Sequence, residues 1–331
     1  MNNRLQTYIE WMKTRASSVS SLKSLRIGVD CSNGMASILV HELFPEAVII
    51  NDTLDGTFPN HSPNPLKDEA REQIAALVRE KKLDCGLIFD GDADRCMFVD
   101  ERGEFVQPDY LIPIVARATL NSNNQTIKQS NNPKIIHDVR TSRGAIEELK
   151  RMDCEPVMVP VGHAFAKPIL RKIGAVCGGE LAGHYYFSEF HGCDSGVLAA
   201  LRVLGEVAKA KAEGRTFSEM MRPISGVYAN SGELNFKVED PPSLKLRRAG
   251  KDGKDLAIDR VLACAAAKLP REISRSEIDG IRIEYAEGWI NIRKSNTEPY
   301  LRLLAECDTT MRLDEWVKLL KEAINDTSAV H

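Results

Sequence analysis

The sequence has no long apolar run, no paired cysteines and no large excess of either charge. No stretch approaches the roughly 20 apolar residues that a membrane-spanning helix needs. The opening segment, MNNRLQTYIEWMKTRASS, lacks the apolar core of a secretion signal. The formal charge of −3 rests on 44 basic and 47 acidic residues that are interspersed along 331 positions. We therefore expect a cytoplasmic protein that binds neither nucleic acid nor membranes.

Metal-binding cysteine patterns are also missing. The eight cysteines are scattered, with no C-x-x-C pair and no histidine at zinc spacing. Isolated cysteines of this kind are typical of small buried side chains in a reducing compartment. We therefore expect neither a disulfide framework nor a zinc framework.

The first third of the chain alternates strand and helix patterns. Apolar strand-like runs occur at 25–34, 47–52 and 83–90, and an amphipathic helical pattern occurs at 69–82. The stretch 57–70 is rich in proline, which interrupts both strands and helices, so neither pattern continues through it. This alternation predicts an α/β domain over residues 1–118.

Two further regions follow. After the polar tract 121–133, which we interpret as a surface link, strand and helix patterns alternate again and predict a second α/β domain over 119–224. From 225 to 331 strand patterns dominate and are closed by an amphipathic helix at 311–325. The predicted fold is of the α/β class, with two consecutive α/β domains followed by a smaller α+β domain.

Three carboxylates stand close together in DGDADR, directly after the strand pattern at 83–90. Gly91 gives the backbone freedom to wrap Asp90, Asp92 and Asp94 around one centre. Such a cluster repels itself unless a cation occupies it, and hard oxygen ligands in a tight loop favour Mg²⁺. We therefore predict that these residues bind Mg²⁺, with a solvated acidic turn as the alternative.

Two other protein classes have motifs similar to DGDADR. An EF-hand loop also has acids at its first, third and fifth positions, but here Arg95 stands sixth, where glycine is needed. Haloacid-dehalogenase phosphotransferases place an Asp-x-Asp at a strand end, yet their motif has Thr or Val where this chain has Asp94. We exclude the EF-hand and keep the phosphotransferase as a weaker alternative.

Two later stretches offer groups that suit a phosphorylated sugar. In GGELAGH, Glu180 can accept hydrogen bonds from hydroxyls and His184 can exchange a proton near neutral pH. In IRKSNTEPY, Arg293 can grip a phosphate in bidentate fashion while short polar side chains and backbone N–H groups bind its other oxygens. Read alone, the first is more often a simple glycine turn, and the second is as often a polar hairpin loop as a phosphate site.

The order of four motifs, DGDADR, VGHAF, GGELAGH and RKSNTEP, resembles the bacterial phosphomannomutase/phosphoglucomutase branch of the α-D-phosphohexomutases. The stretches VDCSNGMAS and DGTFPNHSPNPLK are similar to that family's second domain. The resemblance covers nearly the whole chain. It implies family domains II, III and IV over 1–118, 119–224 and 225–331, carrying the metal-binding, sugar-binding and phosphate-binding loops in turn.

The resemblance also implies roles for individual residues. Asp90, Asp92 and Asp94 would hold Mg²⁺, and Arg95 would lie beside the phosphoryl group in transfer. Arg140, in HDVRTSR, stands where the family has a basic residue near the active site. His184 would help to move the proton. The implied substrate-binding residues are Gly162, His163, Glu180, Arg293, Ser295, Asn296 and Thr297.

Two departures from the family pattern stand out. The sugar loop of the family reads G-E-x-S-G-H, whereas this chain has Ala182 in place of the serine. The family's first domain, whose T-A-S-H-N-P loop carries the catalytic phosphoserine, has no counterpart in this sequence. NHSPNP at 60–65 is superficially similar to that loop, but its place in the order of motifs assigns it to the second domain, so Ser62 is not expected to be the donor.

The resemblance therefore predicts an Mg²⁺-dependent phosphohexomutase that interconverts hexose 1-phosphate and 6-phosphate, with mannose or glucose as the sugar. Without a donor serine of its own, the chain would need a separate phosphoserine domain. A non-catalytic sugar-phosphate-binding protein derived from a mutase is the alternative of a different class, and a fragment of a longer mutase is the third. The sequence does not choose between them.

Overall fold

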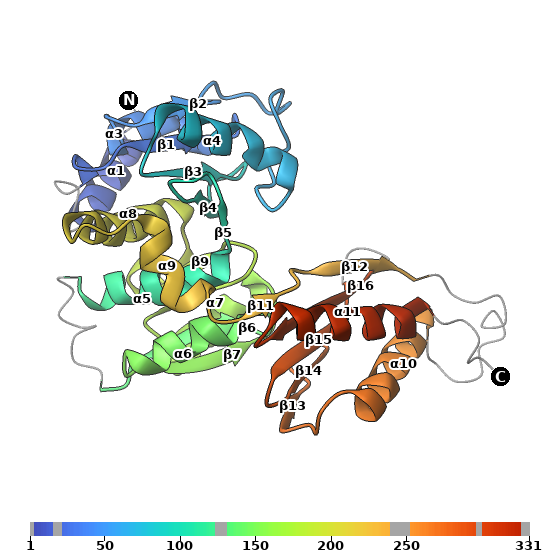
Figure 1. The fold of residues 1–331 in the computed structure, drawn as a ribbon. Coiled ribbons are helices and arrows are strands. Elements are labelled where there is room, and N and C mark those ends of the chain that lie inside the picture. The colour runs from blue at the N-terminus through green and yellow to red at the C-terminus, as the bar shows by residue number, and fades with distance from the viewer. Residues whose placement is uncertain (1–2, 16–21, 123–130, 239–251, 296–299, 326–331) are drawn as a thin grey trace. The chain divides into compact units, whose positions relative to one another are not determined.

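The computed structural model describes residues 3–15, 22–122, 131–238, 252–295 and 300–325. It divides into two compact units, Met1–Ser225 and Gly226–His331 (Figure 1). No helix among the described residues is both long and apolar enough to cross a membrane. Six of the eight cysteines are buried, which confirms the expectation of buried apolar side chains for Cys31, Cys85, Cys96, Cys154, Cys177 and Cys307.

The first sheet has the strand order β2-β1-β3-β4-β5. Strands β1 (Ile27–Asp30), β2 (Val48–Ile50) and β3 (Cys85–Phe89) are parallel. Strand β4 (Cys96–Val99) pairs antiparallel with β3, and β5 (Phe105–Val106) pairs antiparallel with β4. Every residue of β3 is buried, as expected for a central strand covered on both faces. Helix α4 (Asp68–Lys81) packs its buried Ile74 and Val78 near Gly86, where a larger side chain would meet both.

Shorter elements complete this part of the chain. They are α1 (Asn3–Arg15), the 3-10 turn η1 (Met35–Ile38), α3 (Val40–Leu43) and the 3-10 turn η2 (Pro108–Leu111). Residues 37–44 have a helical sequence pattern, but they are split between η1 and α3, with Leu39 between them outside helical geometry. Buried residues of α1, η1 and α3 join the same apolar core as β1.

The second sheet has the order β10-β9-β8-β6-β7. It contains β6 (Lys134–Asp138), β7 (Glu155–Val159), β8 (Cys177–Gly179), β9 (Tyr185–Phe187) and β10 (Cys193–Asp194). Strands β7, β6 and β8 are parallel. Strand β9 pairs antiparallel with β8, and β10 pairs antiparallel with β9. A Cβ atom on Gly178 would lie 2.2 Å from the carbonyl oxygen of Ile136, so the close approach of β8 to β6 requires glycine there.

Helices connect and cover these strands: α5 (Ile112–Leu120), α6 (Arg143–Arg151), α7 (His163–Ile173), η3 (Ser188–Phe190), α8 (Gly196–Ala212) and α9 (Phe217–Ser225). Helix α8 is buried on nearly all sides and contacts both α5 and β4 (Figure 1). An apolar helix of this kind belongs inside a fold. The two sheets of residues 1–225 therefore share one continuous apolar core.

The C-terminal unit is a single antiparallel sheet with helices. Its order is β11-β16-β15-β14-β13, with β12 also paired to β16. The strands are β11 (Ala229–Asn230), β12 (Leu234–Lys237), β13 (Ser274–Ser276), β14 (Ile281–Glu284), β15 (Gly288–Lys294) and β16 (Tyr300–Cys307). Alternate residues such as Ile290, Ile292 and Leu303 form one apolar core with residues of α10 (Gly253–Lys268) and α11 (Thr310–Asn325).

The predicted fold class and the succession of two α/β regions and one α+β region are confirmed. The predicted division at 118 falls inside α5, and the division at 224 falls one residue before the border between the compact units. Most of the predicted polar link, residues 123–130, lies outside the described residues. Helices α1 and α10 were not predicted.

Candidate functional site

The acidic loop lies between β3 and β4. Asp90 follows the last residue of β3, and the chain returns at Arg95 because Phe89 and Cys96 are paired across the two strands. Ala93 has a φ of 63°, so the left-handed residue of this turn is Ala93 and not Gly91. Gly91 instead accepts a hydrogen bond from the backbone N–H of Met35 at 2.9 Å. The loop is thereby tied to the start of η1.

The structure brings the three predicted carboxylates together. Asp90, Asp92 and Asp94 each offer an oxygen, and these atoms lie within 4.8 Å of one another. Burial raises the pKa of Asp90, with Asp94 adding to the rise and Arg95 opposing it. Burial and then Asp90 raise the pKa of Asp92. Oδ1 of Asp94 is buried without a hydrogen-bond partner among the described residues. Converging, partly desolvated oxygens of this kind can hold a metal ion.

Arg95 lies beside this loop. Its Nε donates to Oδ2 of Asp90 at 2.7 Å, and its backbone N–H donates to Oδ1 at 3.1 Å. Its Nη1 donates to the side-chain oxygen of Asn64 at 3.4 Å. Asn64, in the NHSPNP stretch, was not among the predicted site residues. The guanidinium is thus held from two sides next to the acidic loop, with its side chain 22% exposed.

The acidic loop and the GGELAGH loop adjoin one another. Arg95 and His184 form an antiparallel β-bridge, and the backbone N–H of Cys96 donates to the carbonyl of Gly183 at 3.4 Å. Gly183 has a φ of 87°, and a Cβ atom there would lie 2.8 Å from the methyl carbon of Met97. Two motifs that are far apart in the sequence therefore meet at a position that requires glycine.

Glu180 is buried at the turn of the GGELAGH loop, with 1% of its surface exposed. Its Oε1 accepts a short hydrogen bond from the hydroxyl of Tyr186, and its Oε2 accepts one from the backbone N–H of Gly162 at 3.1 Å. Burial and then the nearby Asp138 raise the pKa of Glu180. The structure thus joins the predicted Gly162 to the predicted Glu180.

His184 faces a carboxylate that the sequence reasoning missed. Its Nδ1 lies 3.1 Å from Oδ2 of Asp194 and 3.6 Å from Oδ2 of Asp94. Burial lowers the pKa of His184, but these carboxylates outweigh burial and raise it. Nζ of Lys167 lies 2.8 Å from Oδ1 of Asp194. Although burial opposes the effect, His184 and Lys167 hold the pKa of Asp194 at about 2.

His163 lies at the edge of this group. Its Nδ1 is 4.0 Å from Oδ2 of Asp194, and its ring centroid is 5.7 Å from that of His184. Its side chain is 56% exposed, so it is the accessible histidine of the two. Asp194 stands directly before Ser195, whose Oγ caps α8 by accepting from the N–H of Leu198 at 3.1 Å. The serine that caps this helix was therefore the sequence feature that could have identified the preceding Asp194 as a carboxylate in a fixed position.

Arg140 lies deeper, with 4% of its surface exposed. Its backbone N–H and its Nη2 donate to the carboxylate of Asp138 at 2.7 and 2.6 Å. The same Nη2 lies 3.9 Å from Oε2 of Glu180. The backbone N–H of Leu181 also donates to Asp138, at 3.1 Å. Arg140 therefore supports the GGELAGH loop indirectly, because it fixes the Asp138 carboxylate that accepts a hydrogen bond from Leu181.

The predicted phosphate-binding residues lie in the C-terminal unit. Arg293 on β15 is directly opposite Arg302 on β16. Nη2 of Arg293 and Nη1 of Arg302 donate to the two oxygens of Glu233 at 3.0 and 2.8 Å, and Nη2 of Arg302 donates to Oγ of Ser295 at 3.3 Å. Glu233 and Arg302 were not predicted. Asn296 and Thr297 lie outside the described residues.

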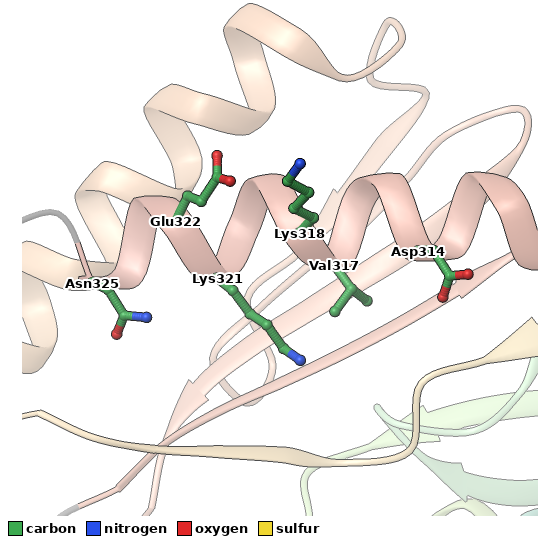
Figure 2. A pocket seen from close by; sticks show the side chains of 6 residues that line it. All are labelled: Asp314, Val317, Lys318, Lys321, Glu322 and Asn325. Atoms are coloured by element: carbon green, nitrogen blue, oxygen red, sulfur yellow. The ribbon is translucent and has the colours of Figure 1, made fainter.

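An open hollow of about 600 Å³ runs along α11 and contains none of the predicted site residues. Figure 2 shows the side chains that line it, all projecting from this one helix: Asp314, Val317, Lys318, Lys321, Glu322 and Asn325. Its two acidic and two basic side chains do not converge on one point. The candidate site is therefore identified by converging side chains and not by this hollow.

Comparison with known proteins covers most of the chain. Three family models match: phosphoglucomutase/phosphomannomutase alpha/beta/alpha domain II over residues 6–103, alpha/beta/alpha domain III over 107–225, and the C-terminal domain over 233–323. They follow one another in the order expected from the motifs.

Individual relatives agree with these matches. A phosphomannomutase of Methanocaldococcus jannaschii is 34% identical over 303 residues, which are 90% of this chain and 61% of that protein. A phosphomannomutase of Escherichia coli is 31% identical over 331 residues, covering 96% of this chain and 67% of that protein. The crystal structure of a phosphoglucomutase/phosphomannomutase family protein from Burkholderia thailandensis superposes with a TM-score of 0.73 at 25% identity, covering 96% of this chain and 63% of that one.

The chain thus spans about three fifths to two thirds of the length of these relatives. It belongs to the phosphoglucomutase/phosphomannomutase family.

Proposed function

We propose that this chain provides the metal, sugar and distal-phosphate sites of a phosphohexomutase that interconverts hexose 1-phosphate and 6-phosphate. The observation that carries the proposal is the β-bridge between Arg95 and His184, because it joins the acidic loop to the GGELAGH loop. A metal ion and a candidate proton acceptor would then act at one place. Mannose and glucose phosphates are the proposed substrates, in keeping with the names of the relatives.

In this proposal Asp90, Asp92 and Asp94 hold Mg²⁺, which would neutralise charge on the phosphoryl oxygens during transfer. The oxygen-only ligand set and the unpartnered Oδ1 of Asp94 support that ion over softer metals. Arg95 presents its guanidinium to the phosphoryl group from a fixed position. Arg140 contributes through Asp138 and Glu180, because its own charge is already paired.

Glu180, Gly162 and His163 form the proposed sugar site. The carboxylate of Glu180 accepts two protein hydrogen bonds already, so a sugar hydroxyl would bind to its remaining lone pairs or displace Gly162. His163 is exposed enough to meet the sugar, and His184 is the proposed proton acceptor. Ala182 offers no hydroxyl, so this loop would make one side-chain contact with the sugar fewer than a loop with serine at that position.

The distal phosphate is proposed to bind at Arg293 and Ser295, together with Asn296 and Thr297. Arg302 lies opposite Arg293 on the neighbouring strand, so two guanidinium groups face one position. That arrangement suits a dianion. Glu233 offsets one of the two positive charges.

Phosphoryl transfer also needs a donor. We propose that a phosphoserine on a further domain supplies it, outside the three domains that the family models match in this sequence. A non-catalytic sugar-phosphate-binding protein is the alternative function, which the assay below distinguishes from a mutase. Positioning and electrostatics alone do not transfer a phosphoryl group without a donor.

The test is a mutase assay with mannose 1-phosphate, Mg²⁺ and a trace of the 1,6-bisphosphate, with and without an added phosphoserine domain from a related mutase. We expect weak sugar-phosphate binding by the chain alone and turnover only when the domain is added. Turnover by the chain alone, abolished by Asp92→Asn, would contradict the need for a separate donor. Binding without rescue would favour the binding protein, and the absence of both would overturn the proposed function.

A further inference from the structure

We propose that Asp194 is the positioning residue of His184, fixing the imidazole as the tautomer that carries its proton on Nδ1 and leaves Nε2 free to accept one. The role of His184 in proton transfer rests on the proposed function. The orientation itself does not, because it follows from contacts within residues 1–225.

The first argument is the pairing of two buried atoms. Nδ1 of His184 and Oδ2 of Asp194 are buried and lie 3.1 Å apart, within reach of a hydrogen bond, but neither atom makes one of good geometry with any described residue, including the other. Buried polar atoms are almost always satisfied. A proton on Nδ1 would satisfy both atoms after a small rotation of the ring, whereas the other tautomer would place two acceptors against each other.

The second argument is that Asp194 is itself fixed. Its Oδ1 lies 2.8 Å from Nζ of Lys167 on α7, and its side chain is 6% exposed. The residue belongs to the short strand β10, and the next residue caps α8. The carboxylate is therefore held by two helices and a strand. The ring of His184 also lies 18° from parallel to that of Tyr186, with 6.4 Å between centroids.

The competing carboxylate is Asp94, whose Oδ2 lies 3.6 Å from the same Nδ1. This distance is beyond that of an ordinary N–H···O hydrogen bond. Asp94 is also a member of the acidic loop and is proposed to face the metal. Asp194 is therefore assigned the orienting role.

The chemical consequence concerns Nε2. With Nδ1 protonated, Nε2 carries a lone pair and can take the proton of a sugar hydroxyl. The O–H bond breaks, an Nε2–H bond forms, and the oxygen keeps the electron pair for attack on phosphorus. The resulting imidazolium faces the Asp194 carboxylate, which stabilises its charge. Base and orienting carboxylate in this order are a recurring arrangement for proton transfer.

The test determines the tautomer directly by two-bond ¹H–¹⁵N NMR correlation on the full chain with ¹⁵N-labelled histidine. The sample contains a chelator, and the pH is set so that the spectrum shows a neutral ring. The seven histidines require an assignment variant, His184→Gln. We expect His184 of the unmodified chain to carry its proton on Nδ1. A proton on Nε2 would overturn the proposal without any variant.

Asp194→Asn gives a sharper outcome. The lysine ammonium only donates, so the amide oxygen should stay toward Lys167 and the amide NH₂ should face Nδ1 of His184. Nδ1 must then accept, and the ring proton should move to Nε2. Retention of the Nδ1 proton in Asp194→Asn would overturn the proposal, as would a switch caused by Asp94→Asn instead.

Lys167→Met is the matched control, because it removes the other partner of Asp194 and leaves the contact with His184. We expect it to keep the proton on Nδ1. If a substitution only disrupted the local structure, it would also disturb the ring of Tyr186, which lies next to His184. The proposed role of Asp194 instead predicts a change of tautomer in Asp194→Asn and no change in Lys167→Met or Asp94→Asn. None of these readouts requires turnover, so failure of the mutase assay and failure of this inference are separate results.

Discussion

The backbone N–H of Gly162 donates a hydrogen bond to Oε2 of Glu180 at 3.1 Å, which links the VGHAF and GGELAGH motifs. The other oxygen of Glu180 accepts from the hydroxyl of Tyr186. A residue predicted for its contact with sugar therefore also holds the loop that begins α7. Its substitution should affect folding as well as binding.

Glu180→Ala should lower the free energy of unfolding by about 1–3 kcal/mol, because the buried hydroxyl of Tyr186 and the partly buried N–H of Gly162 lose their acceptor. Glu180→Gln should cost less, since its amide oxygen can still accept from one of them. Urea denaturation of both variants and the unmodified chain gives the comparison. Equal stability of Glu180→Ala and the unmodified chain would show that these hydrogen bonds contribute nothing to the fold.

The acidic loop should bind Mg²⁺ with an affinity that Asp92→Asn greatly reduces. Asp92 is the exposed member of the group, so its change removes a ligand charge without disturbing the buried contact between Asp90 and Arg95. Isothermal titration calorimetry with Mg²⁺ measures the effect. Asp68→Asn, which alters an exposed carboxylate on α4, is the control and should bind normally. Equal binding by Asp92→Asn and the unmodified chain, or binding by neither, would contradict the metal site.

The sequence was sufficient to predict elements with strong periodic patterns or motifs. The apolar run that became β3 and the acids that follow it were recognised because a short buried strand ending in a turn has a clear pattern. Helix α10 was missed because its buried face consists largely of small residues such as Ala257 and Ala265. Its start does have a signal, the capping box of Asp252 and Asp255.

Side-chain partners across the fold were beyond sequence reasoning. Asp194 lies ten positions after His184, and Glu233 lies sixty before Arg293, so no local spacing connects either pair. These contacts depend on strand register and on where α8 begins. The resemblance predicts which residues carry the chemistry, and the structure shows which residues contact them.

A pH effect on stability should arise at the end of β1. Nε2 of His61 lies 3.1 Å from Oδ2 of the buried Asp30, and this hydrogen bond raises the pKa of His61 in the folded chain. A raised folded-state pKa adds stability that is fully present below the unfolded value of about 6.5 and is lost as the pH rises through the folded value.

The unmodified chain should therefore lose more stability than His61→Gln between about pH 5.5 and 8.5. Urea denaturation at several pH values measures the difference between the two proteins. His41→Gln is the control, because its side chain is 64% exposed in its contact with Asp52. A difference between the unmodified chain and His61→Gln that does not change with pH would show that His61 does not titrate differently on unfolding.

Arg293→Ala should weaken the binding of hexose phosphate by at least tenfold, because a charge-assisted hydrogen bond contributes about 1.5–3 kcal/mol. Arg293 is 4% exposed and shares Glu233 with Arg302, so its loss also leaves Glu233 with one fewer positive neighbour and makes the site less favourable for an anion.

The matched control is Lys294→Ala on the same strand, because Lys294 pairs with Asp252 and Asp255 and points to the other face of the sheet. Calorimetric titration with mannose 1-phosphate compares the variants. The same dissociation constant for Arg293→Ala and the unmodified chain would place the phosphate elsewhere, and equal weakening by Lys294→Ala would indicate a general effect of positive charge.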